Sequence, residues 1–371
     1  MKWKTRANKA QEAILEHYCK PLPGKRDTVI GLAHDRMTLN ERRFSQAWHY
    51  WIQAHFVDAI IDAGIRSNGT EAKRLFELAK TVLHTIKKKN GHKWKNNYYD
   101  DMAWMILAIT RLLEHIDDTD HSLRYAQHTL EQQLRSGYSD ELGGGIYWRK
   151  RDELTRKKDH FKNTPSNGPS AIYFFRKGDS ELGTAIVNWA IDKLYDPKQK
   201  LFLDGIRPNK NSGADVVELL FTYNQGTMLG ALLELGTPEA LELADDLIHG
   251  TSDEFIVETN KLRPLRTHGT GDGGIFTGIL CRYLAIAALD ERLDIKTRKL
   301  AVEMIQNTAI GLWKGKTSDN LAPITFSADP LVKATDFFEP KDRVELSTQV
   351  QAWMIFEAMA KIEAADSNLL L

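Results

Sequence analysis

The stretch that shows the repeating unit of the fold most clearly is Asp101-Met102-Ala103-Trp104-Met105-Ile106-Leu107-Ala108-Ile109-Thr110-Arg111-Leu112-Leu113-Glu114-His115-Ile116. Its apolar residues recur every three or four positions, as they do on one face of an α-helix. The residues that keep this spacing are Met102, Met105, Ile106, Ile109, Leu112, Leu113 and Ile116. The same periodicity predicts twelve helical stretches along the chain. They lie near 6–19, 42–64, 70–88, 101–116, 120–136, 168–177, 180–196, 215–235, 237–250, 272–290, 295–311 and 344–363.

The connections between these helices alternate between short and long. Short connections are predicted near 65–69, 117–119, 178–179 and 236–237, and long ones near 20–41, 89–100, 137–167, 197–214, 251–271 and 312–343. A short connection forces its two helices to lie antiparallel as a hairpin. Six hairpins joined by long loops place all the long loops at one end of the molecule.

We therefore predict an all-α (α/α)6 barrel of six inner and six outer helices, with its functional face at the long-loop end. An open solenoid of helical repeats is the alternative. It is disfavoured because the helix pairs share no consensus and their spacing is irregular. The chain has no Pro/Gly/Ser-rich linker, so residues 1–371 are predicted to form a single domain. The runs 145–148 and 200–203 are expected to form small hairpins over the barrel end.

Composition excludes several classes of protein. The 371 residues are 42% hydrophobic, enough for a large core, so wholesale disorder is excluded. Fifty Lys and Arg balance fifty Asp and Glu. A neutral chain has no bulk attraction for phosphate, so we expect no nucleic-acid partner. Two cysteines, Cys19 and Cys281, without a CxxC pattern argue against a disulfide scaffold and a thiolate zinc site.

Nothing in the sequence predicts membrane attachment or export. The basic start, residues 1–8, is not followed by the apolar run of a secretory signal. No stretch approaches the roughly 20 apolar residues of a membrane span. The expectation is a soluble, cytoplasmic protein, although a secreted protein whose leader has been removed would give the same pattern.

The most specific chemical feature is an adjacent pair of acids, Asp100 and Asp101, at the start of a predicted inner helix. Acids at a helix N-terminus are also ordinary capping residues. Two other pairs, Asp117-Asp118 and Asp245-Asp246, fall where solvated surface charge is expected. The first pair differs because Tyr98, Tyr99 and Trp104 surround it, and aromatic rings provide a low-dielectric wall and a stacking surface.

Two carboxylates a few ångströms apart cannot both ionise easily, so one apparent pKa rises and the other falls. The ionised group can act as a nucleophile and the protonated one as a general acid. In glycoside hydrolysis a separation of about 5–5.5 Å predicts retention, and one of about 6.5–9.5 Å predicts inversion.

Other polar segments converge on the same end of the predicted barrel. The segment 141–148 joins a glycine turn to Tyr147 and Trp148, and 162–169 leads into an inner helix. Segment 222–227 places two amides, Asn224 and Gln225, in an apolar helix, which suggests either hydroxyl-binding groups or a structural network. Asp272, ahead of Phe276 and Arg282, either binds a sugar hydroxyl or caps a helix.

Several motifs of cofactor and metal enzymes are missing or misplaced. Residues 269–274 match GxGxxG, but no strand is predicted before them, so a dinucleotide site is not expected. No HExxH, Walker-type GKS/T or GxSxG pattern occurs. We therefore expect no cofactor and no metal. The Lys87-Lys88-Lys89 run is interpreted as a helix C-terminus.

The motifs described above occur in an order that resembles glycoside hydrolase family 76, the endo-α-1,6-mannanases. The stretches that carry the resemblance are Tyr99-Asp100-Asp101 with Ala103-Trp104, Gly144 to Trp148, Lys162-Asn163 with Ser166 to Pro169, Thr222 to Gly226, and Asp272 with Phe276, Gly278 and Arg282 to Leu284. The resemblance runs from about residue 48 to residue 283 and is looser to the end of the chain. Five ordered motifs are specific together, although each alone is weak.

The resemblance implies an (α/α)6 barrel, retaining hydrolysis of α-1,6-linked mannose, and no metal. By that analogy Asp100 would be the nucleophile and Asp101 the acid/base. The residues predicted to bind an oligosaccharide or polysaccharide substrate are Tyr99, Trp104, Gly144, Tyr147, Trp148, Asn167, Asn224, Gln225, Asp272, Phe276 and Arg282. The oligomeric state is not predicted.

This sequence departs from the family pattern at Met102 and Met105, where a polar or acidic residue and a second Trp are common, and at Thr164-Pro165. These departures are expected to alter the sugar subsites. Three alternatives remain open: a sugar-binding relative with weak catalysis, another (α/α)6 sugar enzyme such as an epimerase or an unsaturated-uronide hydrolase, and a helical scaffold. An epimerase would require two or more histidines lining the site.

Overall fold

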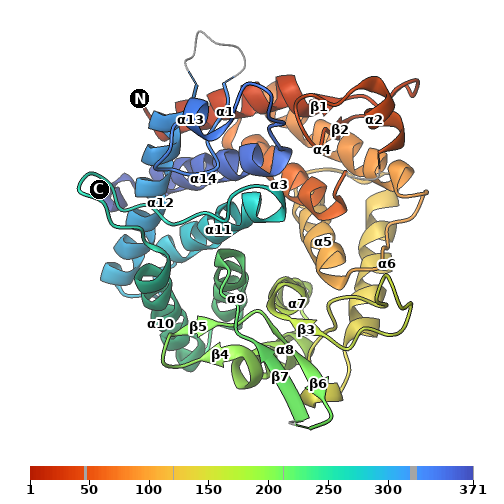
Figure 1. Cartoon of the computed structure of the whole chain (residues 1–371), viewed down its shortest axis with the longest axis vertical. Helices are drawn as coiled ribbons and strands as arrows, with labels where there is room; N and C mark the ends of the chain where they lie inside the picture. The colour runs from red at the N-terminus through yellow and green to blue at the C-terminus, as the bar shows by residue number, and fades with distance from the viewer. Residues whose placement is uncertain (46–47, 120, 212, 318–323, 371) are drawn as a thin grey trace.

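The computed structural model describes residues 1–45, 48–119, 121–211, 213–317 and 324–370. Helices dominate this part of the chain, and Figure 1 shows them as two concentric rings seen end on. Six described helices form the inner ring: α3 (Tyr50–Arg66), α5 (Tyr99–Leu113), α7 (Thr164–Lys177), α9 (Thr222–Leu235), α11 (Phe276–Ala288) and α14 (Leu346–Ala365). Each packs against the next, and α14 packs back against α3, so the ring is closed.

A second ring covers the first. Its described helices are α1 (Trp3–Tyr18), α4 (Gly69–Lys89), α6 (Ser122–Gly137), α8 (Ser180–Leu194), α10 (Pro238–Phe255) and α12 (Ile295–Gly315). Five of them follow an inner helix in sequence and pack against it, whereas α1 packs against α14. The first and last long helices therefore complete the sixth pair. The predicted (α/α)6 barrel is confirmed, and the open solenoid is wrong because the ring closes.

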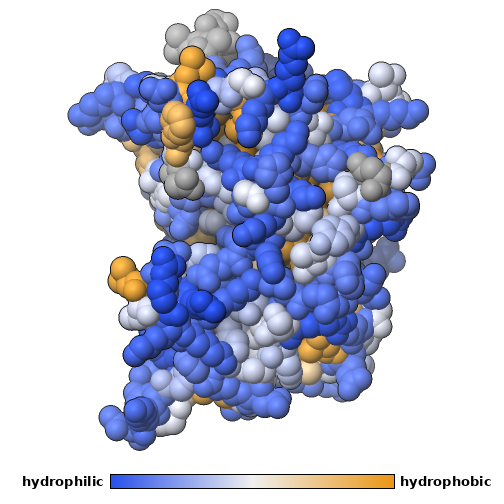
Figure 2. Space-filling model, turned by 90° about the vertical axis from the view of Figure 1, so that its right-hand side faces the viewer, coloured by the Kyte–Doolittle hydropathy of each residue, from blue (hydrophilic) through white to orange (hydrophobic). Residues whose placement is uncertain are grey.

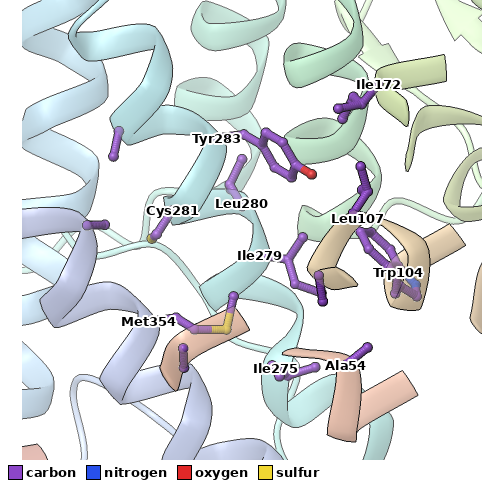
Figure 3. Packing of buried hydrophobic residues seen from close by; sticks show 14 of the residues in the cluster. Ala54, Trp104, Leu107, Ile172, Ile275, Ile279, Leu280, Cys281, Tyr283 and Met354 are labelled. Atoms are coloured by element: carbon purple, nitrogen blue, oxygen red, sulfur yellow. The ribbon is translucent and has the colours of Figure 1, made fainter. Parts of the chain in front are cut away.

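The position of each helix follows from its hydrophobic pattern. The outer helix α4 buries one face and exposes charged residues on the other. The inner helix α14 is buried on nearly all sides, as a helix that is apolar all round must be. Figure 3 shows how residues of different inner helices meet in the interior, with Trp104 and Leu107 of α5 facing Ile279 of α11.

Tight turns set the direction of the inner helices. Gly178 (φ 87°) ends α7 and Gly236 (φ 65°) ends α9, both in the left-handed conformation that glycine adopts without strain. The next residues, Asp179 and Thr237, cap the helices that follow. Such turns leave room only for antiparallel hairpins. The N-termini of all inner helices therefore point to one end of the barrel, called here the loop end.

Short strands and helices cover the loop end. The strands are β1 (Cys19–Lys20) with β2 (Ile30–Gly31), β4 (Tyr195–Asp196) with β5 (Leu201–Phe202), and the antiparallel sheet β3 (Lys162–Asn163), β6 (Gly205–Asn209) and β7 (Gly213–Val217). The short helices there are α2 (Leu39–Phe44), α13 (Ala334–Phe337) and the 3-10 turns Glu141–Gly143 and Gly271–Ile275. A third 3-10 turn, Ser367–Leu369, follows the C-terminus of α14 at the opposite end of the barrel. The run 200–203 contributes β5 to a hairpin as predicted, and 145–148 forms only isolated bridges.

Two of the predicted helices are partly wrong. The stretch 42–64 contains the end of α2 and most of α3, and residues 46–47 lie outside the described residues. The stretch 215–235 begins with β7, not with helix, because Val216 and Val217 pair with Ile206 and Gly205 of β6. The local apolar spacing is helical, but the partner strand satisfies the backbone. Part of the predicted long loop 312–343, residues 318–323, also lies outside the described residues.

Among the described helices, none combines the length and the apolar character that crossing a lipid bilayer requires.

Candidate active site

Asp100 and Asp101 lie in the first turn of α5, at the loop end, and both side chains are half-buried. The backbone N–H of Tyr99 donates to the carbonyl of Trp148 at 2.8 Å. This bond holds the segment 144–150 against the start of α5. The Trp148 side chain is thereby brought to the first of the two carboxylates.

The two carboxyl groups have different hydrogen-bond partners. Asp100 accepts a bond from Nε1 of Trp148 at 3.0 Å on one oxygen and from the backbone N–H of Asp101 at 2.9 Å on the other. Asp101 accepts a bond from Nδ2 of Asn96 at 2.5 Å. Because N–H donors stabilise the charged form of a carboxylate, Asp100 is better prepared than Asp101 to be ionised.

The pKa values follow the same order. Burial raises the pKa of Asp100 to about 7, against the opposing effect of its hydrogen bonds from Asp101 and Trp148. Burial, followed by the negative charge of Asp100, raises the pKa of Asp101 well above its usual range. The two groups titrate as a coupled pair. At neutral pH the proton therefore resides on Asp101, and Asp100 is the first to ionise.

A third carboxylate, Asp204, approaches the pair from the junction between β5 and β6. It is half-buried and accepts a hydrogen bond from Nδ2 of Asn224 at 3.3 Å. Burial raises its pKa, and its charge contributes to the raised pKa of Asp100. Asn224 itself is fully buried, so this predicted site residue acts on the site through Asp204.

A fourth carboxylate, Asp272, lies in the 3-10 turn before α11 and is exposed. It accepts a hydrogen bond from Nε1 of Trp51 at 3.2 Å, and its charge contributes to the raised pKa of Asp101. Carboxyl groups from three separate segments thus surround one region of the loop end. Such a concentration of negative charge favours a transition state that develops positive charge.

Aromatic rings form one side of the same region. Tyr223 at the start of α9 stacks on Phe276 at the start of α11, with ring centroids 3.9 Å apart and planes 9° apart. Trp51 on α3 lies 6.1 Å from Phe276. Burial raises the pKa of Tyr223 well above its usual range, and the charges of Asp204, Asp100 and Asp272 add to the effect. The Tyr223 ring therefore stands among the carboxylates, where it offers an apolar face to a sugar.

Two histidines lie near the site, but they do not form an acid/base pair. His55 is buried, and its ring centroid lies 4.7 Å from that of Trp104, with the planes tilted by 54°, and 5.7 Å from that of Trp51. Burial lowers its pKa to about 3, so it is neutral. Burial also lowers the pKa of His268 to about 4, and its Nε2 accepts a bond from the backbone N–H of Thr222 at 3.3 Å. This arrangement does not support the epimerase alternative.

Arg282 lies deeper in the barrel than the predicted substrate site. Its guanidinium pairs with Asp62 at 2.7 Å. Arg111 on α5 pairs with the same carboxylate and with Asp58, both at 2.5 Å. These charges neutralise one another in the barrel interior, toward the C-terminal ends of α3 and α5. Arg282 therefore has a structural role as an ion-pair partner of Asp62 and does not reach the carboxylate pair.

Three other predicted site residues are engaged in contacts away from the pair. The Tyr99 ring packs on Gly137, where a side chain would collide with it. Gly144 packs on Trp189, and its carbonyl accepts a bond from Nζ of Lys162 at 2.5 Å. Tyr147 precedes Trp148 in an extended segment, so the two side chains point to opposite sides.

The hydroxyl of Tyr147 donates to Glu141 at 2.6 Å, on the side away from Asp100.

The residues at which this sequence departs from the family pattern are remote from solvent. Met102, Met105 and Thr164 are fully buried, so they do not line an accessible subsite.

Asn167 and Gln225 form backbone clamps. Each is fully buried and makes paired hydrogen bonds with one loop residue, accepting from its N–H and donating to its carbonyl. Asn167 holds Ile146 at 2.8 and 2.9 Å, and Gln225 holds Phe202 at 2.8 and 2.8 Å. The same device recurs on other inner helices, where Gln53 holds Gly31 and Gln349 holds Phe326. These amides fix the loops to the barrel.

The clamp of Gln225 gives a stability prediction. Replacing Gln225 with Leu leaves the buried N–H and carbonyl of Phe202 without partners, which should lower the free energy of unfolding by roughly 2–4 kcal/mol. Chemical denaturation of the variant measures this loss. Gln132→Leu, at an exposed position of α6, is the matched control and should change stability little. Unchanged stability combined with a raised KM would instead support the predicted sugar-binding role of Gln225.

In the described part of the chain, no group of three or more His, Cys, Asp and Glu side chains is arranged to hold a metal ion.

Fold and site together define the class. A closed ring of inner helices presents two adjacent carboxyl groups with unequal proton affinity beside aromatic rings. A glycoside hydrolase needs such a pair, one group ionised and one protonated, next to its sugar site. The model of glycosyl hydrolase family 76 matches residues 2–367, and the chain belongs to this family. It is therefore a glycoside hydrolase of the α-1,6-mannanase type. The predicted family is confirmed. No curated protein matches the chain.

Solved structures give the same result. An α-1,6-mannanase of Salegentibacter sp. HEL1_6, solved as an inactive variant with two adjacent aspartates replaced by asparagine and in complex with α-1,6-mannotriose, is 27% identical. The match covers 96% of this chain and 99% of that one, with a TM-score of 0.80. A Listeria innocua protein is 25% identical over 98% of both chains, with a TM-score of 0.79. A Bacteroides thetaiotaomicron family 76 mannosidase, 16% identical over 98% and 99% with a TM-score of 0.78, shows the shared fold.

Sequence reasoning missed Trp51 and Asp204. A signal for Trp51 existed: it begins a row with His55, Asp58 and Asp62, spaced at four, three and four along an otherwise apolar helix. Polar residues on the inner face of a buried helix mark an interior site. Asp204 carried no such signal, because an Asp before Gly in a loop normally indicates a turn.

Proposed function

We propose that this enzyme hydrolyses α-1,6-mannosidic linkages with retention of configuration, with Asp100 as nucleophile and Asp101 as general acid/base. The observation that carries the proposal is the unequal setting of the two adjacent carboxyl groups. Asp100 is held by two N–H donors, whereas burial, followed by the negative charge of Asp100, raises the pKa of Asp101 and keeps the proton there. The known complex of a 27% identical α-1,6-mannanase with α-1,6-mannotriose supports the substrate class.

In the first step the ionised carboxylate of Asp100 attacks the anomeric carbon and forms a glycosyl ester. The bond from that carbon to the leaving oxygen breaks, and Asp101 gives its proton to this oxygen. In the second step Asp101 takes a proton from water, and the water oxygen displaces Asp100 from the anomeric carbon. The negative charges of Asp204 and Asp272 stabilise the positive charge that develops on the sugar in both steps.

Product stereochemistry tests the proposal. The enzyme is mixed with α-1,6-mannotriose, and the first minutes of reaction are followed by proton NMR of the anomeric signals. The α-anomer of the new reducing end should appear first, and the β-anomer should follow only by mutarotation. An α-1,2-linked mannobiose serves as the linkage control and should remain intact.

Two outcomes would contradict the proposal. If the β-anomer appears first, the reaction inverts and Asp100 is not a nucleophile. If calorimetry shows binding of the trisaccharide but NMR shows no product, the protein is the weakly catalytic sugar-binding relative that the sequence left open.

A further inference from the structure

A second concentration of charge lies outside the carboxylate site, between α2 and α4. A cavity of about 420 Å³ is bounded there by residues 22–25, by the ends of both helices and by Trp48. Its charged lining residues are Lys25, Arg42, Arg43, Lys88 and Lys89, and they define what we call the cationic pocket. Among the described residues that line it, none is acidic.

The charges of the cationic pocket are not neutralised locally. In the described part of the chain, no carboxylate forms an ion pair with any of the five cations. The one acid of α2, Glu41, instead pairs with Arg343 at 3.2 Å and caps its own helix through Thr38. Lys89 has a lowered pKa, first because it is buried and then because Lys25 is close. The pocket therefore holds like charges together in a chain whose net charge is zero.

Helix capping accounts for only part of this charge. α2 and α4 both end at the pocket, and basic residues in a last turn are favourable there. Each helix end carries about half a negative charge. Two ends offset about one of five positive charges. Solvent screens the exposed side chains of Lys25, Arg43 and Lys88, and a bound anion that displaces this solvent would interact with all five cations.

The cationic pocket lies next to the active site. α4 runs antiparallel to α3, so its C-terminal lysines lie at the loop end. Trp48 of the pocket wall contacts the Tyr50 ring, with centroids 6.0 Å apart. Tyr50 is buried and donates to the carbonyl of Trp94 at 2.6 Å. Its pKa is raised well above its usual range by burial and then by the charge of Asp101. The contact between Trp48 and Tyr50 thus joins the pocket wall to a residue close enough to the catalytic pair to feel the charge of Asp101.

The composition of the pocket identifies the chemistry of its ligand. Guanidinium and ammonium groups bind the oxygens of phosphate and sulfate esters. Trp48 and Phe44 in the same wall offer apolar rings to a sugar, and a volume of about 420 Å³ is in the range of small-molecule sites. A groove for a nucleic acid would instead be an extended basic stripe. Figure 2 shows the side of the molecule with α2 and α4 as largely hydrophilic, which fits a polar ligand.

We propose that the cationic pocket binds the phosphate or sulfate ester group of an anionic saccharide, so that the enzyme favours mannosides that carry such a group near the cleaved linkage. The saccharide part rests on the proposed function. Binding of the ester anion itself does not depend on it.

Calorimetry with three probes, inorganic phosphate, mannose 6-phosphate and mannose, tests the proposal. Mannose 6-phosphate should bind the wild-type enzyme at least tenfold more tightly than either mannose or phosphate, and added salt should weaken it. The double variant Arg43→Gln with Lys88→Gln should lose at least tenfold in this affinity. Lys73→Gln, at the opposite end of α4, is the control and should bind like wild type.

Kinetics separate this proposal from the proposed function. With wild type, a phosphorylated α-1,6-mannotriose should have a kcat/KM at least tenfold above that of the neutral trisaccharide. With the double variant, the two substrates should have the same kcat/KM, and the neutral one should be cleaved as by wild type. The proposed anion site is wrong if the double variant and the control bind mannose 6-phosphate with equal affinity, or if wild type binds mannose and mannose 6-phosphate equally. If inorganic phosphate binds as tightly as mannose 6-phosphate, the ligand is a free anion and the proposed saccharide ester is wrong. If the anion binds but neither trisaccharide is cleaved, only the proposed function fails.

Discussion

Replacing Asp100 with Asn should reduce kcat on α-1,6-mannotriose by at least about 10⁴-fold. An amide is a poor nucleophile for an anomeric carbon, so the covalent step is lost, and losses of this size are typical when an enzyme loses its attacking group. The exchange keeps the shape of the side chain, and the amide oxygen still accepts the bond from Trp148 while the bond from the Asp101 N–H is lost, so the fold should be retained. Initial rates of reducing-sugar release measure the effect, and circular dichroism checks the fold.

The matched control for this variant is Asp117→Asn. Asp117 also begins an adjacent pair of acids, but it is exposed beyond the end of α5, far from the loop end. Its replacement should leave kcat and KM unchanged. An Asp100→Asn enzyme that keeps more than about a tenth of wild-type kcat would remove Asp100 from the mechanism.

The architecture could be predicted because it depends on local patterns. Apolar spacing marked the helices, and the alternation of short and long connections implied the barrel. The predicted helix 215–235 failed at its start because β7 owes its structure to a partner, β6, and not to its own periodicity. Strand pairing between segments is a tertiary effect that overrides local propensity.

The site residues were predictable where functional side chains are adjacent in sequence. They were less predictable where side chains from separate loops come together only in the fold. Asp100, Asp101, Trp148, Asp272 and Phe276 meet as expected at the loop end. The buried amides were ambiguous, because an amide that binds a sugar and one that clamps a backbone have the same sequence. Gln225 and Asn167 are distinguished only by the loops that they hold, which come from distant segments.

Replacing Asp101 with Asn should separate the two catalytic roles. The variant lacks the proton donor, which contributes about 10²–10⁴-fold, so cleavage of α-1,6-mannotriose should fall by that factor. A 4-nitrophenyl α-1,6-mannobioside has a leaving group that needs no proton, so Asp100 can still form the glycosyl ester. Hydrolysis of that ester needs a base and stays slow. A burst of nitrophenol equal to the enzyme concentration should therefore precede a slow steady rate.

The pH dependence of the Asp101→Asn variant should differ from that of wild type in one limb. In wild type, kcat/KM rises with pH as Asp100, with its pKa raised to about 7, loses its proton, and it falls at higher pH as Asp101 loses its own. The variant cannot lose a proton at position 101. Its rise on the acid side should remain, and its fall on the alkaline side should disappear.

The pH dependence of the unfolding temperature provides an independent test of whether Asp101 carries a proton in the folded state. The pKa of Asp101 is higher in the folded state than in the unfolded state, so the folded state binds more protons between these two values. The stability that Asp101 contributes therefore falls as pH rises above about 4, the pKa of an unfolded aspartate. Asparagine has no such linkage, so Asp101→Asn should raise the unfolding temperature at pH 8 and leave it nearly unchanged at pH 4.

The same variants decide between the two possible assignments of the roles. Asp100→Asn cannot form the ester, so it should give no burst with the nitrophenyl substrate, whereas Asp101→Asn should. A burst from Asp100→Asn and none from Asp101→Asn would exchange nucleophile and acid/base. That result would contradict the order of proton affinities, because the group held by Trp148 would then carry the proton. Rapid-mixing absorbance measurements on both variants resolve the question directly.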